Sequence, residues 1–262
     1  MKEKMNKLYI LSSGAGGTSY ITTQAVEAIN DSEVIVSYTK YAKELKELIV
    51  GKELYTSGMT HEIDRCQQAI NSAKSGKTTC IVSNGDVNVF GMATLIVELI
   101  DEQNLWDEIE VISIPGVTSF LAAASRVGAP VSQDFAVISL SDRLTDINMI
   151  DKRVRGALAG DFIIGIYNPK SKTRIKPYQN FLKALSQVDE KIAIIASNVG
   201  REKEKITITT STDLIAQDIT HPDVSMSTLI MVCNSNTRLT KNGKVLTPRG
   251  YLNKYDMDGE LK

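Results

Sequence analysis

Residues 112–124, Ile-Ser-Ile-Pro-Gly-Val-Thr-Ser-Phe-Leu-Ala-Ala-Ala, decide how the chain can be arranged. The apolar run 111–114 predicts a buried strand, and Pro115-Gly116 predicts the turn that ends it. Thr118 or Ser119 is suited to cap the alanine-rich helix that follows. A strand that ends in a turn and a capped helix leaves backbone N–H groups free, and open α/β sheets bind ligands at such places. We expect this stretch to join two lobes, because it lies near the middle of the chain.

The composition limits the classes of partner. The chain has 262 residues, of which 42% are hydrophobic and 23% charged, as is typical of a soluble globular protein. Its formal net charge of −1 creates no general attraction to nucleic acid or to an anionic membrane. No apolar run approaches the roughly 18 residues of a membrane span. We therefore expect no nucleic acid and no membrane as partner, and an anionic substrate would need a local cluster of Lys and Arg.

The N-terminus and the cysteines indicate a cytoplasmic protein. Residues 1–7 are charged and lead into a short apolar strand without a small-residue cleavage site, which argues against a signal peptide. Cys66, Cys80 and Cys233 are far apart and odd in number, so they form neither a metal-binding spacing nor a disulfide framework. We expect reduced thiols and no metal site.

Apolar segments alternate with segments of helical periodicity along the chain. This alternation predicts an α/β fold whose first lobe, residues 1–113, is a parallel sheet covered on both faces. A second α/β lobe would span residues 114–240, and a polar tail residues 241–262. The predicted strands are 8–11, 34–36, 79–82, 111–114, 135–140, 162–167, 192–196, 206–210 and 227–232. Helices are expected within 25–29, 41–49, 60–73, 91–100, 119–124, 151–158, 177–185 and from 214.

Two glycine-containing turns follow predicted strands. Residues 14–17, Gly-Ala-Gly-Gly, would let the backbone approach a ligand closely, although they also suit a simple strand-to-helix turn. Their spacing fits neither the dinucleotide fingerprint nor the phosphate-binding loop. In residues 83–93, Asp86 could accept hydrogen bonds from ribose hydroxyls or an amino group beside Gly85. Asp86 is equally a common type of turn residue.

A third candidate is the basic loop after the strand at 162–167. Lys170, Lys172 and Arg174 lie within five residues, between that strand and a helix. Such a cluster suits carboxylates or phosphates, and the alternative is a solvated basic face. His61 and His221 are isolated and form no nucleophile arrangement. Asp142, which follows the strand at 135–140, is a candidate general acid or base and equally a candidate helix cap.

Taken together, these segments resemble those of the tetrapyrrole methylases. Residues 128–142 and 167–174 resemble in particular the members that methylate carbon 17 of precorrin-3B or of its cobalt-bound counterpart. The resemblance covers most of the chain and is carried by residues 14–23, 57–59 with Glu62 and Arg65, 83–93, 115–142, 167–174 and 197–202.

The resemblance implies a two-lobed α/β fold with a mainly parallel sheet in the first lobe and a mixed sheet in the second. The active site would lie in the cleft between the lobes. It implies an S-adenosyl-L-methionine-dependent methyltransferase of cobalamin biosynthesis, acting on a precorrin tetrapyrrole with contraction of the macrocycle, and a homodimer. A sulfonium methyl is already activated for in-line displacement, so such an enzyme mainly has to align it with the accepting carbon.

Site residues follow from the same resemblance. The cofactor contacts would be Gly85, Asp86, Val89, Thr118, Ser119, Tyr167, Asn198 and Thr228. Gly14, Gly16 and Gly17 would face the tetrapyrrole rather than the cofactor. We add the hypotheses that Lys170, Lys172 and Arg174 meet the substrate carboxylates and that Asp142 moves a proton during ring contraction.

The sequence departs from the family pattern in both glycine turns. The first turn usually contains a proline that residues 15–17 lack, and the second usually continues with Pro-Gly where this chain has Val87-Asn88. Because proline fixes backbone angles, we expect these loops to be more flexible here. The alternatives are a tetrapyrrole methylase acting at another position, a cofactor-binding homologue without activity, and a nucleotide-linked oxidoreductase, against which the missing dinucleotide fingerprint argues.

Overall fold

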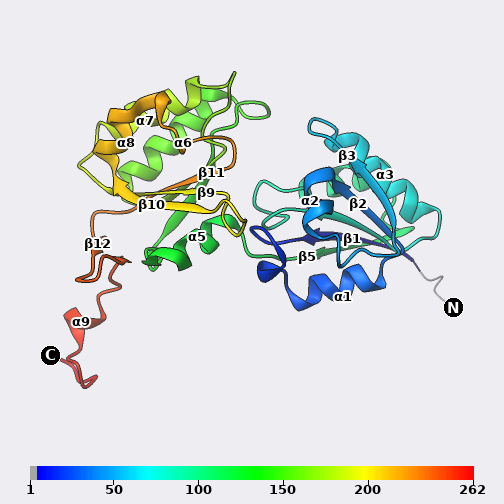
Figure 1. The fold of residues 1–262 in the computed structure, drawn as a ribbon, viewed down its shortest axis with the longest axis horizontal. Coiled ribbons are helices and arrows are strands. Elements are labelled where there is room, and N and C mark those ends of the chain that lie inside the picture. Colours follow the sequence, from blue (N-terminus) through cyan, green and yellow to red (C-terminus); the bar gives the residue numbers. More distant parts are fainter. Residues whose placement is uncertain (1–4) are drawn as a thin grey trace. The chain divides into compact units, whose positions relative to one another are not determined.

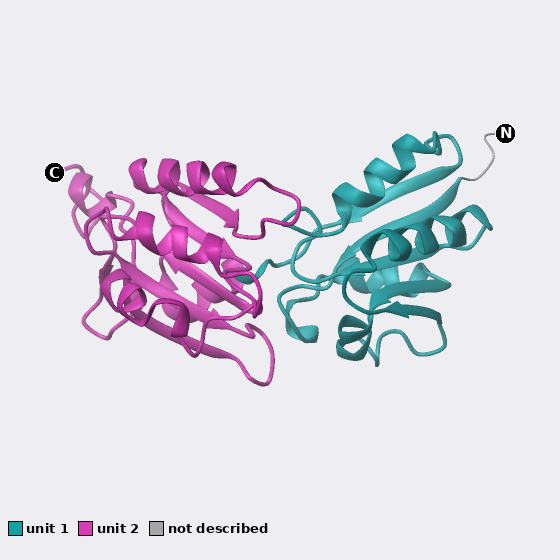
Figure 2. Cartoon of the chain, turned by 90° about the horizontal axis from the view of Figure 1, so that it is seen from above, with its two compact units in different colours: residues 1–119 teal, residues 120–262 magenta. Residues whose placement is uncertain are grey.

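The computed structural model describes residues 5–262, which form two compact units, residues 5–119 and 120–262 (Figure 2). Residues 1–4 of the charged N-terminal segment lie outside the described part. The division along the chain falls between Ser119 and Phe120, at the start of the alanine-rich helix. The division at residues 113/114 and 240/241 that we drew from the sequence stays a prediction.

The first unit is built on an all-parallel sheet with strand order β3-β2-β4-β1-β5 (Figure 1). Leu8 and Ile10 face a core cluster with α3 and α4, while Tyr9 and Leu11 face another with α1 and α2. The sheet is therefore covered on both faces, which confirms the prediction for this lobe. Its strands are β1 Asn6–Ser12, β2 Val34–Tyr38, β3 Glu53–Ser57, β4 Thr79–Ser83 and β5 Ile109–Ile114; its helices are η1 Thr18–Tyr20, α1 Thr23–Asp31, α2 Thr39–Glu44, α3 Glu62–Lys74 and α4 Ala93–Glu102.

Two details of the first unit differ from the sequence-based expectation. Strand β3 was not expected, because its side chains are mostly exposed at the sheet edge and it carries no apolar run. The helix expected over residues 41–49 is α2, which begins earlier and ends at Glu44.

The second unit contains the mixed sheet that the resemblance implied, with strand order β10-β9-β11-β8-β7. Strands β7 and β8 are parallel, and β11 runs antiparallel to both β8 and β9. Its core joins β-strand side chains to α6, α7 and α8. The main elements are α5 Ser119–Val127, β7 Phe135–Ser139, α6 Ile147–Ala159, β8 Ile163–Tyr167, α7 Lys176–Leu185, β9 Ile192–Ser197, β10 Lys205–Thr210, α8 Ser211–Gln217, η2 Asp218–Thr220 and β11 Thr228–Val232.

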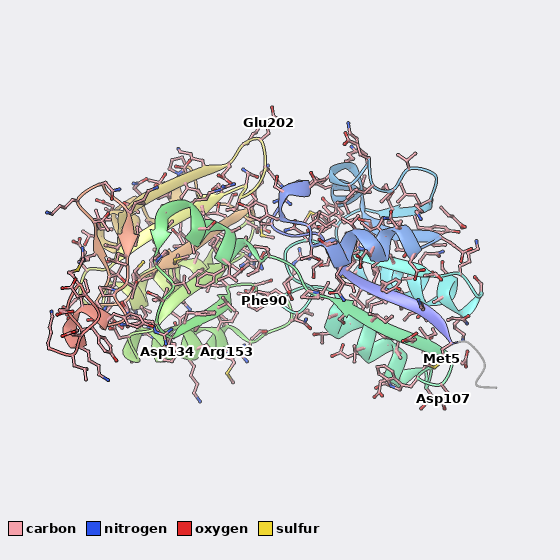
Figure 3. The ribbon with its side chains drawn as sticks, turned by 90° about the horizontal axis from the view of Figure 1, so that it is seen from below. Met5, Phe90, Asp107, Asp134, Arg153 and Glu202 are labelled. Carbon is pink, nitrogen blue, oxygen red and sulfur yellow. The ribbon has the colours of Figure 1, made fainter. Side chains whose placement is uncertain are left out.

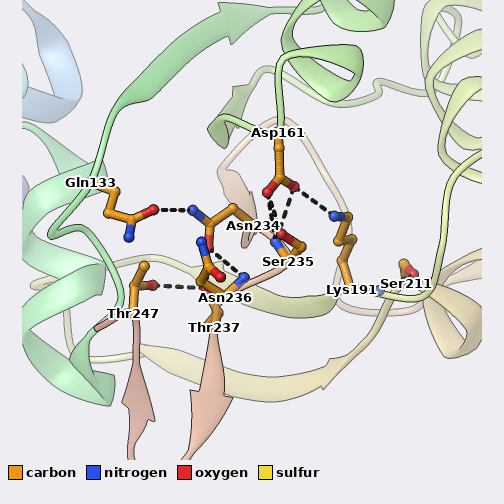
Figure 4. Close-up of polar contacts among 9 residues, drawn as sticks. All are labelled: Gln133, Asp161, Lys191, Ser211, Asn234, Ser235, Asn236, Thr237 and Thr247. Atoms are coloured by element: carbon orange, nitrogen blue, oxygen red, sulfur yellow. Dashed lines mark hydrogen bonds and ion pairs between the residues drawn. The ribbon is translucent and has the colours of Figure 1, made fainter. Parts of the chain in front are cut away.

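The C-terminal segment is fastened to the second unit. Strands β12 Arg238–Leu239 and β13 Val245–Leu246 form a small sheet with β6 Gly128–Ala129, and α9 Tyr251–Lys254 follows. Asp161 accepts hydrogen bonds from Lys191 and Ser235, and Asn234 donates to Gln133 at 2.7 Å (Figure 4). The buried Thr247 donates its hydroxyl to the carbonyl of Pro130 at 2.6 Å and pairs with the Thr237 hydroxyl.

We predict that Thr247→Val lowers the free energy of unfolding by about 1–3 kcal/mol, because it leaves a buried carbonyl without its donor. Denaturant unfolding measures the change. Thr173→Val is the matched control, because Thr173 is exposed, and no change is expected there. An equal loss in both variants would contradict the assigned role of Thr247.

Candidate functional site

The carboxyl ends of three adjacent strands bring the predicted turns of the first unit together. Strand β1 lies between β4 and β5 in the parallel sheet. The loops that follow these strands, residues 13–17, 84–92 and 115–118, therefore emerge at the same edge. Three segments that are far apart in the sequence thus form one local structure.

Gly14 and Gly85 pair directly. The Gly14 N–H donates to the Gly85 carbonyl at 3.2 Å, and the Gly85 N–H donates to the Gly14 carbonyl at 2.7 Å. Both residues have positive φ, +77° and +70°, which favours glycine. The structure therefore joins the loop that we assigned to the tetrapyrrole with the turn that we assigned to the cofactor. Gly16 and Gly17 continue the first loop up to η1.

Asp86 connects the second turn to the third. One carboxylate oxygen accepts the Gly116 N–H at 2.9 Å, and the other accepts the Asn88 N–H at 2.8 Å. The neighbouring Val87 N–H donates to the buried Ser12 hydroxyl at 2.9 Å. Asp86 thus links the turn at residues 84–92 to the segment 115–118. Its carboxylate oxygens keep further lone pairs with which they could accept a hydrogen bond from a ligand.

Gly85 is buried but not crowded. A Cβ atom built there would meet only Thr118, at the ordinary van der Waals distance of 3.8 Å. Val89 lies in the same loop, and its N–H donates to the Asp86 carbonyl at 3.1 Å. Ser119 begins α5 directly after Thr118. The loops at this edge and the start of α5 contain the residues that we expect to contact the cofactor: Gly85, Asp86, Val89, Thr118 and Ser119.

The three cofactor contacts expected in the second unit also lie at one edge of its sheet, where β8 and β9 end and β11 begins. The Tyr167 hydroxyl accepts the Phe120 N–H at 3.1 Å, near the start of α5. Asn198 has a φ of +51° and donates its N–H to the Ser227 carbonyl at 3.2 Å. The buried Thr228 hydroxyl donates to the Asp223 carbonyl at 2.7 Å and accepts the Ser225 N–H at 3.0 Å. A ligand at Thr228 would therefore meet its backbone.

The three cations of the basic loop differ in their surroundings: two bind backbone carbonyls and one is exposed. Lys170 donates to the backbone carbonyls of Ile219 and His221, and burial lowers the pKa of its ammonium group. Arg174 donates to the carbonyls of Leu140 and Asn168 at 2.5 and 2.8 Å, and burial lowers its pKa as well. Lys172, in contrast, is exposed. Lys170 and Arg174 hold the loops of the second unit together, which the run of charges did not indicate.

Asp142 lies beside this basic loop. Its carboxylate is 3.9 Å from the Nε atom of Arg174, and the side chain is exposed. Two residues beside this loop were not singled out from the sequence. The Asn168 amide donates to the Ser139 hydroxyl at 3.1 Å and so links the ends of β7 and β8. The sequence feature that could have indicated this hydrogen bond is a polar residue at the end of each of two predicted strands, Ser139 and Asn168.

The sequence matches known proteins along most of its length. The family model of the Tetrapyrrole (Corrin/Porphyrin) Methylases matches residues 7–215. The chain belongs to the tetrapyrrole methylase family. It is 39% identical to a probable cobalt-factor III C(17)-methyltransferase of Methanocaldococcus jannaschii, over 95% of this chain and 99% of the relative. A precorrin-3B C(17)-methyltransferase of Sinorhizobium sp is 34% identical over 93% of this chain and 96% of the relative.

A solved methylase structure shares the fold over nearly the whole chain. The crystal structure of the methyltransferase CobJ superposes with a TM-score of 0.85 at 29% identity, covering 93% of this chain and all of that one. The fold class inferred from the sequence, an α/β methylase with a parallel and a mixed sheet, is thereby confirmed.

Within residues 5–262, no group of three His, Cys, Asp or Glu side chains could hold a metal ion, and no helix is long and apolar enough to cross a membrane. Cys66, Cys80 and Cys233 are buried and free. Burial raises the pKa of the Cys66 and Cys233 thiols to about 12, and it raises that of Cys80 further, so none is a ready nucleophile.

We predict that Gly116→Ala lowers the free energy of unfolding by about 1–3 kcal/mol and weakens cofactor binding. The added Cβ would lie 2.5 Å from the Gly85 carbonyl oxygen and would collide with Ser12. Gly156→Ala in α6 is the matched control, because nothing lies within 4 Å of its added Cβ and alanine favours the helix by about 0.5–1 kcal/mol. Chemical denaturation should show opposite signs for the two variants; the same sign would refute the packing argument.

Proposed function

We propose that this methylase transfers a methyl group from S-adenosyl-L-methionine to carbon 17 of cobalt-factor III, with contraction of the macrocycle, in cobalamin biosynthesis. The observation that carries the proposal is the similarity to the probable cobalt-factor III C(17)-methyltransferase, which is 39% identical over 95% of this chain and 99% of the relative. Precorrin-3B, which lacks cobalt, is the second candidate substrate, since the relative named for it is 34% identical.

The residues present fit S-adenosyl-L-methionine. The backbone at Gly85, where an added Cβ would meet only Thr118 at 3.8 Å, and the Asp86 carboxylate in the same turn offer backbone and polar groups to an adenosine or an amino acid moiety. When bound, the cofactor supplies an electrophilic methyl group. The part of the protein is to hold the cofactor and the substrate in line and to exclude water. Tyr167, Asn198 and Thr228 are the contacts we assign to the second unit.

Substrate carboxylates need cations, and Lys172 is the one of the three predicted cations that we retain for them. Gly14, Gly16 and Gly17 would offer backbone groups to the macrocycle. We assign to Asp142 the proton transfer of ring contraction; its carboxylate lies 3.9 Å from the Nε atom of Arg174. We also propose a homodimer and a cytoplasmic location, which the family resemblance and the three free cysteines support.

Calorimetric titration and a methylation assay test the proposal. We expect micromolar binding of S-adenosylmethionine and S-adenosylhomocysteine and none of NADH. With cobalt-factor III, methylation should appear as a mass increase of one methyl group, faster than with precorrin-3B. NADH binding without S-adenosylmethionine binding would favour an oxidoreductase. Binding without methylation of either substrate would favour a homologue without activity or one acting at another position.

We predict that Lys172→Ala raises the KM for cobalt-factor III about threefold to tenfold and leaves S-adenosylmethionine binding unchanged, because it removes one charge-assisted hydrogen bond. Lys183→Ala, an exposed lysine near the end of α7, is the control and should have no effect. Lys170→Ala should instead lower thermal stability, since it frees two carbonyls. A KM that stays at the wild-type value in Lys172→Ala would remove Lys172 from the substrate site.

A further inference from the structure

Arg65 is a buried cation that the fold uses only in part. The residue lies on α3 and is 7% exposed. Its Nη1 atom donates to the Ser57 hydroxyl at 2.6 Å and to the Gly58 carbonyl at 3.1 Å. A guanidinium has five N–H donors on three nitrogens. Within residues 5–262, Nε and Nη2 donate no hydrogen bond, yet neither is fully enclosed, so both stay within reach of a ligand.

The charge of Arg65 is weakly compensated. Among the described residues, the one carboxylate within ion-pair distance is Glu62, whose Oε1 atom lies 3.9 Å from Nη2 and whose side chain is 52% exposed. The guanidinium carbon lies 6.0 Å from the centre of the Tyr38 ring. Arg65 is also the fourth residue of α3, near the end where the helix dipole disfavours a cation. Because buried charges are normally paired at hydrogen-bond distance, this arrangement points to an anionic ligand.

Arg65 lies at the carboxyl edge of the parallel sheet. Figure 3 shows the two ends of the first unit: Phe90 follows β4 at the carboxyl end, and Asp107 precedes β5 at the amino end. Tyr38 and Ser57 are the last residues of β2 and β3, and they pair with each other in the sheet. Since the guanidinium contacts both, it lies at the edge where the proposed ligands bind.

The strand order separates Arg65 from the cofactor turn. Strand β2 lies between β3 and β4, and the turn after β4 holds Gly85 and Asp86. Because neighbouring strands lie about 4.8 Å apart, the ends of β2 and β3 are roughly 5 and 10 Å along the edge from the end of β4. An anion at Arg65 would therefore lie beside the cofactor turn and not in it. A broad substrate that extends along the edge could place a peripheral group there.

We propose that Arg65 binds a peripheral carboxylate of the tetrapyrrole through Nε and Nη2; this rests on the function proposed above. The planar fork of a guanidinium matches the two oxygens of a carboxylate, and such charge-assisted pairs are strong. The bonds from Nη1 to Ser57 and Gly58 fix the orientation of the fork. S-adenosylmethionine also has a carboxylate, and a separate titration distinguishes the two sources.

The test compares Arg65→Met and Arg65→Lys by titration with cobalt-factor III and, separately, with S-adenosylmethionine, and records the Tm of each variant. We expect the Kd for cobalt-factor III to rise about tenfold in the Met variant, which loses the charged pair. The rise should be about threefold in the Lys variant, which keeps the charge but loses the fork. S-adenosylmethionine affinity should not change. Arg153→Met, an exposed arginine of α6 (Figure 3), removes the same charge and is the matched control with no expected effect.

Glu62→Gln is a second variant that leaves Arg65 in place. It removes the one carboxylate that competes for the guanidinium, so the Kd for cobalt-factor III should fall about twofold to threefold. Should Arg65→Met fail to fold, Arg65→Lys and Glu62→Gln decide the question.

A purely structural role would lower the Tm of the Arg65 variants and leave the affinity for cobalt-factor III unchanged in all of them and in Glu62→Gln; that result would overturn the proposal. A loss of S-adenosylmethionine affinity in its place would assign Arg65 to the cofactor carboxylate and overturn it as well. Wild-type protein that binds S-adenosylmethionine but not cobalt-factor III would refute the proposed substrate itself.

Discussion

The reciprocal hydrogen bonds between Gly14 and Gly85 are the constraint on which the first unit's site depends. Chains that leave two neighbouring parallel strands usually diverge towards their helices. Here the Ser13 N–H still donates to the Ser83 carbonyl at 2.8 Å, and beyond it the two glycines form an isolated bridge of antiparallel type. A side chain at Gly14 would collide with Tyr20. Because the two turns are fixed to each other, Asp86 lies within reach of Gly116, and all three turns become one structure.

The second unit reaches a similar end by different means. Hydrogen bonds from side chains to the backbone fix its sheet edge. Lys170 and Arg174 each donate to two backbone carbonyls, and the Thr228 hydroxyl donates to one carbonyl and accepts one N–H. The fold itself uses these three side chains, so a ligand beside them would meet backbone groups. Such a surface suits a reaction that needs alignment more than acid–base chemistry, because the methyl donor is activated before it binds.

The sequence predicted the features that local patterns determine and missed those that distant partners determine. Most buried strands, and the end of β5 before Pro115-Gly116, follow from apolar runs and backbone preferences and were predicted. The buried strand expected at residues 111–114 was wrong in one respect, because β5 lies at the sheet edge and only its first and last residues, Ile109 and Ile114, are buried. Strand β3 gains its pairing at an edge without burial, so no apolar pattern announces it. The orientation of the Lys170 side chain depends on its hydrogen bonds to the carbonyls of Ile219 and His221, about fifty residues away in the chain. A run of cations cannot reveal which of them the fold itself uses.

The missing proline of the second turn also shows that a local pattern does not reveal distant partners. Other interactions restrain this turn in its place. A flexible second turn was expected because Val87 stands where the family usually has proline. Proline fixes φ but has no N–H. In this chain the Val87 N–H donates to Ser12, and the valine side chain is 1% exposed in the first unit's core. The following Asn88 N–H is held by Asp86. Hydrogen bonds and apolar burial thus restrain the turn in place of a pyrrolidine ring, and they tie it to β1 as a proline could not.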